Sequence, residues 1–381
     1  MVNPTPQATG AAEAATNAEN RDAENTRGAT SSNVRPEPAA SPLVSILVPI
    51  CNVQDFLPGC LDSLVNQTLR DIEIVAIDDG STDESGAVLD DYAARDARIV
   101  AVHKQNSGYG DTMNQALALA RAPWIAICEP DDYVEPIMCE HLLACAQLHG
   151  ATDEPIDLVK ASYTRITDAG SAHPVALPSP FHQAVHPPRQ PFSIDECPVL
   201  LSAHPSIWTC LYRRAFLDEF GIRFKPIAGA GWADNPFFLE TLIAARRIAY
   251  LDEPVYNYRE FEDDSISHLR DWHIITDRWN DMQEVLERYD VHIPSILEAH
   301  ACRGCAYLQM LSADFAQEPE LVRAAKAMAQ TLDHDIVCSS SFIPKEYKLA
   351  YGRYLPPDKR ASLLAAWISL HIRSIVRKPT L

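Results

Sequence analysis

The sequence predicts an α/β fold in which a mostly parallel sheet is flanked by helices, followed by a helical C-terminal region. Three observations lead to this prediction. Between residues 41 and 150, short apolar runs alternate with segments of helical periodicity, which indicates βαβ units. Two of the runs end in acidic turns, Asp78-Asp79-Gly80-Ser81 and Glu129-Pro130-Asp131-Asp132. From about Asp271 onward, apolar residues recur at helical spacing.

The first half of the fold is predicted as four strand–helix units. Apolar runs that are short enough for buried strands occupy residues 43–48, 72–77, 98–102 and 124–128. Helices are expected between and after them, at 57–65, 88–92, 113–120 and about 136–148. The segment Ser81-Thr82-Asp83-Glu84 fits a capping box that would open the second of these helices.

The second half has a weaker pattern. Strands are expected at residues 156–163, 211–212 and 248–258, with a Pro- and His-rich loop at 174–191 and a helix at about 213–220. Helical periodicity then predicts helices at 272–289, 294–315, 321–332 and 357–376.

The chain is expected to have three parts. Residues 1–40 contain no Leu, Ile, Phe, Tyr or Trp, so they cannot bury enough apolar surface to offset their ordering entropy. We predict a disordered extension over 1–40, an α/β domain over 41–268 with halves 41–150 and 151–268, and a helical region over 269–381.

Charge and hydropathy exclude two classes of function. The formal net charge of -20 disfavours extended nucleic-acid binding, because an acidic surface repels the phosphate backbone. No stretch approaches the ~18 consecutive apolar residues of a membrane span, and no signal peptide is visible, so a cytoplasmic location is expected.

The segment after Asp358 lacks acidic residues and resembles an interfacial helix in peripheral contact with the inner face of a membrane. Packing on the α/β domain or on a partner is the alternative.

The cysteines and loop histidines favour structural interpretations. Cys302 and Cys305 form the only C-x-x-C pair, without a second pair at zinc spacing. Apolar neighbours predict small buried side chains for Cys51, Cys60, Cys128 and Cys139. Loop histidines without the spacing of a metal site are interpreted as solvated: His173, His182 and His186.

Both acidic turns are expected to face one pocket, because the carboxyl ends of parallel strands meet at one edge of a sheet. Clustered carboxylates repel one another unless a cation or a donor lies among them. A hard divalent metal that bridges to phosphate oxygens would relieve this repulsion. The alternative is structural, since Asp and Gly are common in tight turns.

A glycine-rich stretch leads to a further candidate, Asp234. Gly229-Ala230-Gly231 precedes Asp234 and Asn235, which stand where a helix is predicted to begin, and Pro236 falls in its first turn. An Asp at such a position can serve only to cap the helix. Capping by Asn235 would instead leave Asp234 free to face the pocket. The sequence leaves both alternatives open.

A dinucleotide-binding oxidoreductase is the rival for this kind of N-terminal half. Its G-x-G-x-x-G fingerprint should follow the first strand. The turn at that place is Pro49-Ile50-Cys51-Asn52-Val53, which contains no glycine. The phosphate-binding loop of that class is therefore missing.

Four motifs, in order, resemble the family 2 glycosyltransferases of the GT-A fold, which build bacterial surface polysaccharides. The resemblance covers roughly residues 42–148 and continues more loosely through Ser206-Ile207-Trp208 and Asp234 to Tyr256-Asn257-Tyr258-Arg259. The four matching stretches are Ser45 to Asn52, Asp78 to Asp83, Asn106-Ser107-Gly108 through Asn114, and Glu129 to Val134.

The resemblance implies a nucleotide-sugar donor, with residues 41–150 as the donor half and 151–268 as the acceptor half. Pro49 and Asn52 would edge the base pocket, and Asp79 would hold the uracil or its ribose. The donor residues that the resemblance implies are Pro49, Asn52, Asp78, Asp79, Asn106, Gly108 and Asp131.

The resemblance also implies a metal site and a catalytic base. The family's D-x-D motif for Mn²⁺ or Mg²⁺ falls on Glu129, Asp131 and Asp132, with Glu in place of the usual first Asp. That departure is expected to move the metal contact onto Asp131 or Asp132. Asp234 would be the base, although Ala233 stands where the family often has Glu.

The expected function is that of a metal-dependent, inverting glycosyltransferase. It would move a sugar from a nucleotide-sugar, expected to be a UDP-sugar, to a hydroxyl of a cell-surface glycan or a lipid-linked acceptor. Two alternatives are a nucleotidyltransferase and a catalytically inactive protein that binds nucleotide or sugar. The first usually needs a basic glycine-rich loop after the first strand, which is absent here, and the retained acidic residues speak against the second.

Overall fold

The structure is a computed structural model that describes residues 41–151, 153–167, 169, 173–202, 204–261, 271–314 and 318–376, with backbone alone at 313–314 and 367–376. All of these residues belong to one compact unit over 38–381. The predicted extension over 1–40 lies outside them, and the boundary expected near residue 268 stays a prediction. Among the described helices, none has both the length and the apolar character needed to cross a bilayer.

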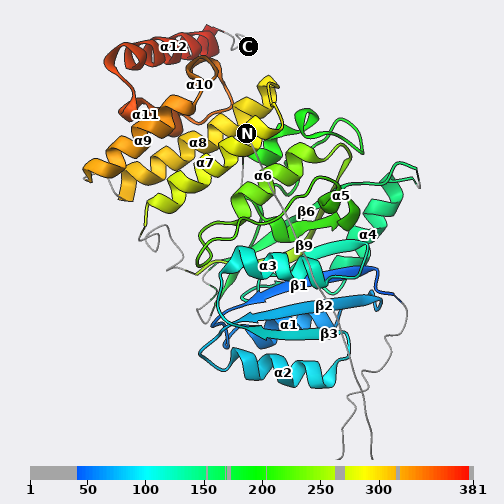
Figure 1. Ribbon diagram of the computed structural model, residues 1–381. Coiled ribbons are helices and arrows are strands. Elements are labelled where there is room, and N and C mark those ends of the chain that lie inside the picture. Colours follow the sequence, from blue (N-terminus) through cyan, green and yellow to red (C-terminus); the bar gives the residue numbers. More distant parts are fainter. Residues whose placement is uncertain are drawn as a thin grey trace, which may run out of the picture. The chain divides into compact units, whose positions relative to one another are not determined.

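The first half of the sheet is parallel, as predicted, with β3 (Ile99–Lys104), β2 (Ile72–Asp79), β1 (Val44–Ile50) and β4 (Trp124–Ile127) side by side (Figure 1). Every residue of β1 and β2 is buried, which explains why both strands are mostly apolar. A polar pair within them is satisfied internally, because the Ser45 hydroxyl donates to Glu73 Oε1 at 2.6 Å. Because β1 pairs with β2 on one side and β4 on the other, the chain order reverses at β1. Such a reversal opens a crevice beyond the carboxyl ends of the strands.

The second half of the sheet is mixed. After β4 the order continues with β8 (Cys210–Arg213), β6 (Leu158–Thr167), β9 (Ile248–Arg259) and β5 (Tyr133–Val134). β8 is antiparallel to both of its neighbours, whereas β6 and β9 are parallel. The predicted 174–191 loop is partly wrong, because β7 (Val175–Pro178) pairs with β6 there. The sequence did not indicate β5 or β7, since both are short and β7 is exposed along its whole length.

Helices α1 (Leu57–Val65), α2 (Ser85–Arg95), α3 (Tyr109–Leu119) and α4 (Met138–His149) follow the first four strands as predicted. The capping box expected at residues 81–84 is wrong, because α2 begins at Ser85 and has no side-chain cap. Ser81 and Asp83 instead accept hydrogen bonds from the backbone of Asn52 and Gln54 in the loop after β1. The polar residues therefore tie two loops together.

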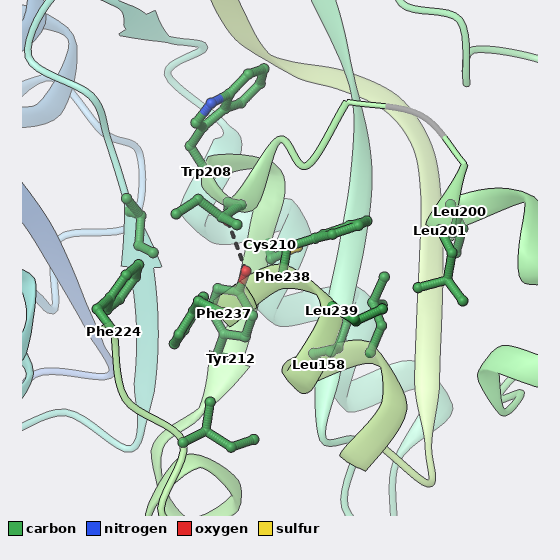
Figure 2. Packing of buried hydrophobic residues seen from close by; sticks show 14 of the residues in the cluster. Leu158, Leu200, Leu201, Trp208, Cys210, Tyr212, Phe224, Phe237, Phe238 and Leu239 are labelled. Carbon is green, nitrogen blue, oxygen red and sulfur yellow. Dashed lines mark hydrogen bonds between the residues drawn. The ribbon is translucent and has the colours of Figure 1, made fainter. Parts of the chain in front are cut away.

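The start of α6 rests on an aromatic core (Figure 2). Phe237 of α6 stacks on Phe224, with ring centroids 3.9 Å apart, and meets Tyr212 of β8 edge-on at 5.5 Å. Each such buried side chain contributes on the order of 1.5–3 kcal/mol. The remaining elements of this half are α5 (Arg214–Glu219), α6 (Asp234–Ala244) and the 3₁₀ turns η1 (Ile194–Glu196), η2 (Pro198–Leu201) and η3 (Ile207–Thr209).

The C-terminal region is helical, as predicted (yellow to red in Figure 1). Two of its helices, α10 and α11, were not expected, because both are short and α11 is rich in charged residues. Its helices are α7 (His273–Arg288), α8 (Pro294–Asp314), α9 (Pro319–Thr331), α10 (His334–Ser339), α11 (Lys345–Tyr354) and α12 (Pro357–Val376).

The ten cysteines are all free. Cys302 and Cys305 are buried, and so are Cys60, Cys128 and Cys139. The expectation of burial is wrong for Cys51, which is exposed because it follows the last residue of β1. Within the described ranges, no three or more His, Cys, Asp or Glu side chains are arranged to hold a metal ion by themselves.

Candidate active site

A cavity of about 350 Å³ opens where the carboxyl ends of β1, β2 and β4 come together. It is lined from both acidic turns, so the sheet brings together the two motifs that the sequence singled out. Six of the residues predicted for the site contribute to this lining: Pro49, Asp79, Asn106, Gly108, Glu129 and Asp131.

Asp79 locks the loop after β3 against the end of β2. Its carboxylate accepts hydrogen bonds from the backbone N–H groups of Ser107, at 2.8 Å, and Gly108, at 3.0 Å, and it pairs with Lys104. Asn106 returns a bond from its side-chain amide to the Asp79 carbonyl, at 2.8 Å. The loop that was expected to lie along the donor is therefore held at the wall of the cavity.

Asp78 and Asn52 stabilise neighbouring turns and do not contribute to the lining. Asp78 accepts from the Ser81 N–H at 2.9 Å and contacts the His103 ring at 3.0 Å. These hydrogen bonds outweigh the effect of burial, and the pKa of Asp78 is lowered. Asn52, which has a left-handed φ of 53°, accepts from the Thr82 N–H at 2.8 Å.

The second acidic turn divides its carboxylates between two tasks. Asp132 is 1% exposed, and both of its oxygens are bonded, one to the Tyr256 hydroxyl at 2.9 Å and the other to the Arg259 N–H at 2.7 Å. The same Tyr256 oxygen accepts from the Glu129 N–H at 3.0 Å. Asp132 therefore shapes the turn, while Glu129 and Asp131 reach the cavity.

Glu129 is held by a residue that the sequence reasoning missed. The Tyr109 hydroxyl at the start of α3 donates to Glu129 Oε1 at 2.6 Å. Burial raises the pKa of Glu129 to about 8, and the charges of Asp131 and Asp234 add to the rise. Tyr109 follows Asn106-Ser107-Gly108 directly, so its place in that motif could have drawn attention to it.

Asp234 lies beside this cluster but is not part of the cavity lining. Its negative charge raises the pKa of both Glu129 and Tyr109, and burial raises the pKa of Asp234 itself. Neither of the predicted capping roles is formed, because α6 begins at Asp234 with Ala233 as its cap residue and without a side-chain cap. The Asp234 carboxylate nonetheless interacts with the backbone N–H groups of Asp234 and Asn235, which lower its pKa against the effect of burial.

A loop from the second half covers the cavity, and the sequence did not place it there. Its Gly229 carbonyl accepts from the Tyr109 N–H at 3.0 Å. Six of the lining residues were not predicted. They come from this loop, from α3 and from the loop after β1: Gly229, Ala230, Tyr109, Thr112, Cys51 and Val53. This contact joins residues about 120 positions apart, so no local sequence pattern could have predicted it.

Replacing Gly108 by Ala is expected to weaken both the fold and nucleotide binding. Gly108 has φ +92°, and an added Cβ would lie 2.1 Å from the Ile227 carbonyl oxygen. With ψ 161°, this backbone lies in a region that is essentially restricted to glycine and costs on the order of 1–3 kcal/mol in other residues. The steric overlap would also displace the 227–230 loop. We expect Gly108→Ala to lower Tm and the affinity for UDP, as measured by thermal shift and calorimetry.

Gly221→Ala is the matched control, because Gly221 has φ +63° and nothing within 4 Å of the added Cβ. It should show the backbone strain only, with unchanged affinity for UDP. Equal losses of Tm in the two variants, with full UDP affinity in both, would contradict the close approach of the 227–230 loop.

The residues present fit a divalent metal that takes most of its ligands from a bound diphosphate. Asp131 lines the cavity, one oxygen of Glu129 is engaged by Tyr109, and both oxygens of Asp132 are bonded. Such a set is too small for an all-protein site. This set of ligands is typical of Mg²⁺ sites, in which the ion is commonly held by one or two carboxylates together with substrate phosphates.

Comparison with known proteins shows which family the first half of the sheet is similar to. Residues 45–171 match the model of glycosyl transferase family 2. The uncharacterized glycosyltransferase EpsJ of Bacillus subtilis is 35% identical over 226 residues, which is 58% of this chain and 61% of EpsJ. The putative glycosyltransferase EpsH of the same organism is 30% identical over 223 residues, again 58% of this chain and 61% of the relative. The chain thus spans about three fifths of the length of these relatives.

Solved structures agree on the fold. The S. aureus TarS fragment 1–349 superimposes with a TM-score of 0.63 over 86% of this chain and 91% of that chain, at 18% identity. A complex of the same fragment with UDP-GlcNAc gives a TM-score of 0.61, also at 18% identity. The α/β fold of the GT-A type is confirmed by this similarity. The match of residues 45–171 to glycosyl transferase family 2 agrees with the resemblance that the four motifs predicted.

Proposed function

We propose that the protein transfers a sugar from a nucleotide-sugar, a UDP-sugar in the first instance, to an acceptor hydroxyl. One observation carries the proposal: the acidic turns after β2 and β4 line the same cavity at the sheet reversal. A family 2 domain that begins at residue 45 supports it. The similar fold of TarS, which has been solved with UDP-GlcNAc, supports the choice of donor for a first test.

The donor's nucleoside would lie against the first half of the cavity. Pro49, Cys51, Asp79 and Asn106 form the wall of this half, in which the Asn106 amide donates to Cys51 Sγ at 3.5 Å. The clamp between Asp79 and the loop after β3 fixes the polar groups of this wall before the nucleotide arrives. A preformed wall reduces the ordering cost of binding. Asp78 and Asn52 would act through the turns that they hold.

The diphosphate would face Asp131, with Glu129 beside it. These two carboxylates would hold Mn²⁺ or Mg²⁺, and Asp132 would keep the turn in shape. The ion supplies neutralisation of the charge that grows on the leaving diphosphate. Tyr109 holds the Glu129 carboxylate in place through its hydroxyl.

Asp234 would serve as the base. In direct displacement, the acceptor oxygen attacks the anomeric carbon opposite the diphosphate, and the bond to the diphosphate oxygen breaks. The hydroxyl proton passes to the Asp234 carboxylate, and the anomeric configuration inverts. The charge of Asp234 acts on both Glu129 and Tyr109, which supports its placement next to the reacting centre.

We extend the proposal to the acceptor, a cell-surface glycan or a lipid-linked sugar met at the cytoplasmic face of the membrane. The groove between α11 and α12 is lined by Leu349 and Leu364 together with Lys345, Arg353 and Arg360, which would suit an anionic bilayer. Co-sedimentation with anionic and neutral vesicles tests this contact. Equal recovery with both kinds of vesicle would remove it from the proposal.

A donor screen tests the function itself. Purified protein should release UDP from one member of a panel of UDP-, GDP- and dTDP-sugars in the presence of Mn²⁺ or Mg²⁺ and candidate acceptors. The same donor should raise Tm, because a ligand that binds only the folded state stabilises it. Pyrophosphate release from a nucleoside triphosphate and a sugar phosphate would favour a nucleotidyltransferase. Absence of any metal-dependent UDP binding would favour an inactive binding protein.

A further inference from the structure

Two side chains of the C-terminal region reach the residue next to Asp234. Tyr307 of α8 donates its hydroxyl to Asn235 Oδ1 at 2.6 Å, and Arg303 Nη1 donates to the same oxygen at 3.3 Å. All three residues are nearly inaccessible, at 5% exposure each. Asn235 is therefore held by the helical region, although it belongs to the first turn of α6.

The two donors fix which way the Asn235 amide points. An arginine side chain can only donate, so the amide oxygen must face Arg303. The Asn235 nitrogen is then turned to the other side, where it donates to Asp234 Oδ1 at 3.2 Å. A rotated amide would place two N–H donors against Arg303 and leave the Asp234 oxygen facing a carbonyl. The direction of the bond to Asp234 is thus set from α8.

Arg303 is itself held rigidly. Its Nε and Nη2 atoms both donate to the Leu201 carbonyl, at 3.1 and 2.8 Å, and its guanidinium lies 5.0 Å from the centre of the Phe238 ring. Because the Arg303 guanidinium is already held by Leu201 and Phe238, it loses little further conformational entropy when it binds Asn235. Its positive charge also lowers the pKa of Asp234, against the effect of burial.

The neighbouring helix α7 holds the loop that covers the cavity. Arg278 donates to the Gly231 carbonyl at 3.2 Å, two residues after Gly229 of the cavity wall. Asp281 pairs with Arg278 at 2.6 Å and also with Lys225, at the start of the loop. Both ends of the 225–231 loop are therefore attached to one helix.

We propose that Tyr307 and Arg303 are positioning residues that orient Asp234 through the Asn235 amide, so that the C-terminal helices complete the active site. This inference rests on the proposed transferase function, with Asp234 as base. Neither residue is among those that line the cavity, and neither is expected to contact the donor. Their effect should therefore appear in the rate of transfer rather than in donor binding.

The test compares Tyr307→Phe with the wild-type full-length protein. Phenylalanine keeps the ring and removes only the hydroxyl donor to Asn235. Misplacement of a reacting group by about 1 Å can cost ~100-fold in rate. In Tyr307→Phe the Asn235 amide keeps only the bond from Arg303, so Asp234 is held less firmly and kcat is expected to fall by about 10-fold. The donor KM should stay within about twofold of wild type. Arg303→Met should lower kcat further, and Arg303→Lys, which keeps the charge, should recover part of the loss.

Tyr289→Phe is a closely matched control. The Tyr289 hydroxyl, at the end of α7, also donates to a side chain of α6, Glu240, at 3.2 Å, but farther along that helix. It should lower Tm at most, with unchanged kcat. A folded Tyr307→Phe variant with the kcat of Tyr289→Phe overturns the inference while leaving the proposed function intact. A wild-type protein without turnover on any donor overturns both.

Discussion

Replacing Asp234 by Asn is expected to lower kcat by roughly 100- to 10,000-fold, the usual contribution of a general base. Asparagine keeps the shape of the side chain but cannot take up the acceptor's proton. Because burial raises the pKa of Asp234, its charged form is disfavoured in the folded protein, so removal of the charge should leave Tm unchanged or raise it. UDP release at saturating donor, together with thermal unfolding, measures both effects.

The matched control is Asp290→Asn, because Asp290 has an 89% exposed side chain and pairs only with the equally exposed His292 among the ion pairs of the described residues. It should behave as wild type in both measurements. Calorimetry should also give Asp234→Asn the wild-type affinity for UDP. An Asp234→Asn variant with full turnover would assign the base to another group.

Replacing Asp131 by Ala is expected to abolish transfer through loss of the metal-dependent part of UDP binding. Asp131 and Glu129 are the two carboxylates of the second acidic turn that line the cavity. If metal and diphosphate contribute several kcal/mol together, the affinity for UDP in Mn²⁺ should fall by about 100-fold or more. Calorimetry with and without Mn²⁺ measures the loss directly.

Asp132→Ala provides the contrast within the same turn. Both oxygens of Asp132 are bonded to Tyr256 and Arg259 in a buried setting, so its removal leaves a buried hydroxyl and N–H without their acceptor. That loss costs about 1–3 kcal/mol per group, and Tm should fall. Asp131→Ala should lose more UDP affinity, relative to its change in Tm, than Asp132→Ala. The reverse pattern would exchange the roles assigned to the two residues.

The sequence was sufficient for features that depend on local pattern. Four apolar runs predicted the four parallel strands, and their alternation with periodic segments predicted α1 to α4. The same logic predicted that the turns at Asp79 and Asp131 would share a cavity, because parallel strands end at one edge. These predictions succeed because a fully buried strand is mostly apolar, and its few polar side chains must find partners within the sheet.

Features that depend on distant partners could not be predicted. Ser81 and Asp83 resemble capping residues, but the loop after β1 offers them other donors. Asn235 resembles a helix cap, yet its amide is bonded by α8, almost 70 residues away. Only the tertiary fold decides which of several equivalent donors a short polar side chain will meet.

The role of Glu129 was also beyond local pattern. Its departure from the family's usual Asp suggested a shifted metal contact, but not its bond to Tyr109. The longer side chain of Glu129 reaches the hydroxyl at the start of α3, which explains how an acidic group with a raised pKa is accommodated there. The hydrogen bond between Tyr109 and Glu129 thus links the Asn106-Ser107-Gly108 motif, expected to lie along the donor, with the second acidic turn, expected to bind the metal.

The most direct measurement of the central claim is a calorimetric titration of the wild-type protein with UDP, with and without Mn²⁺ or Mg²⁺. The account predicts tight binding only when the ion is present, since the Asp131 carboxylate would otherwise face the diphosphate with like charge. Equal affinity for UDP in the presence of the ion and of a chelator would contradict a shared cation between this turn and the donor.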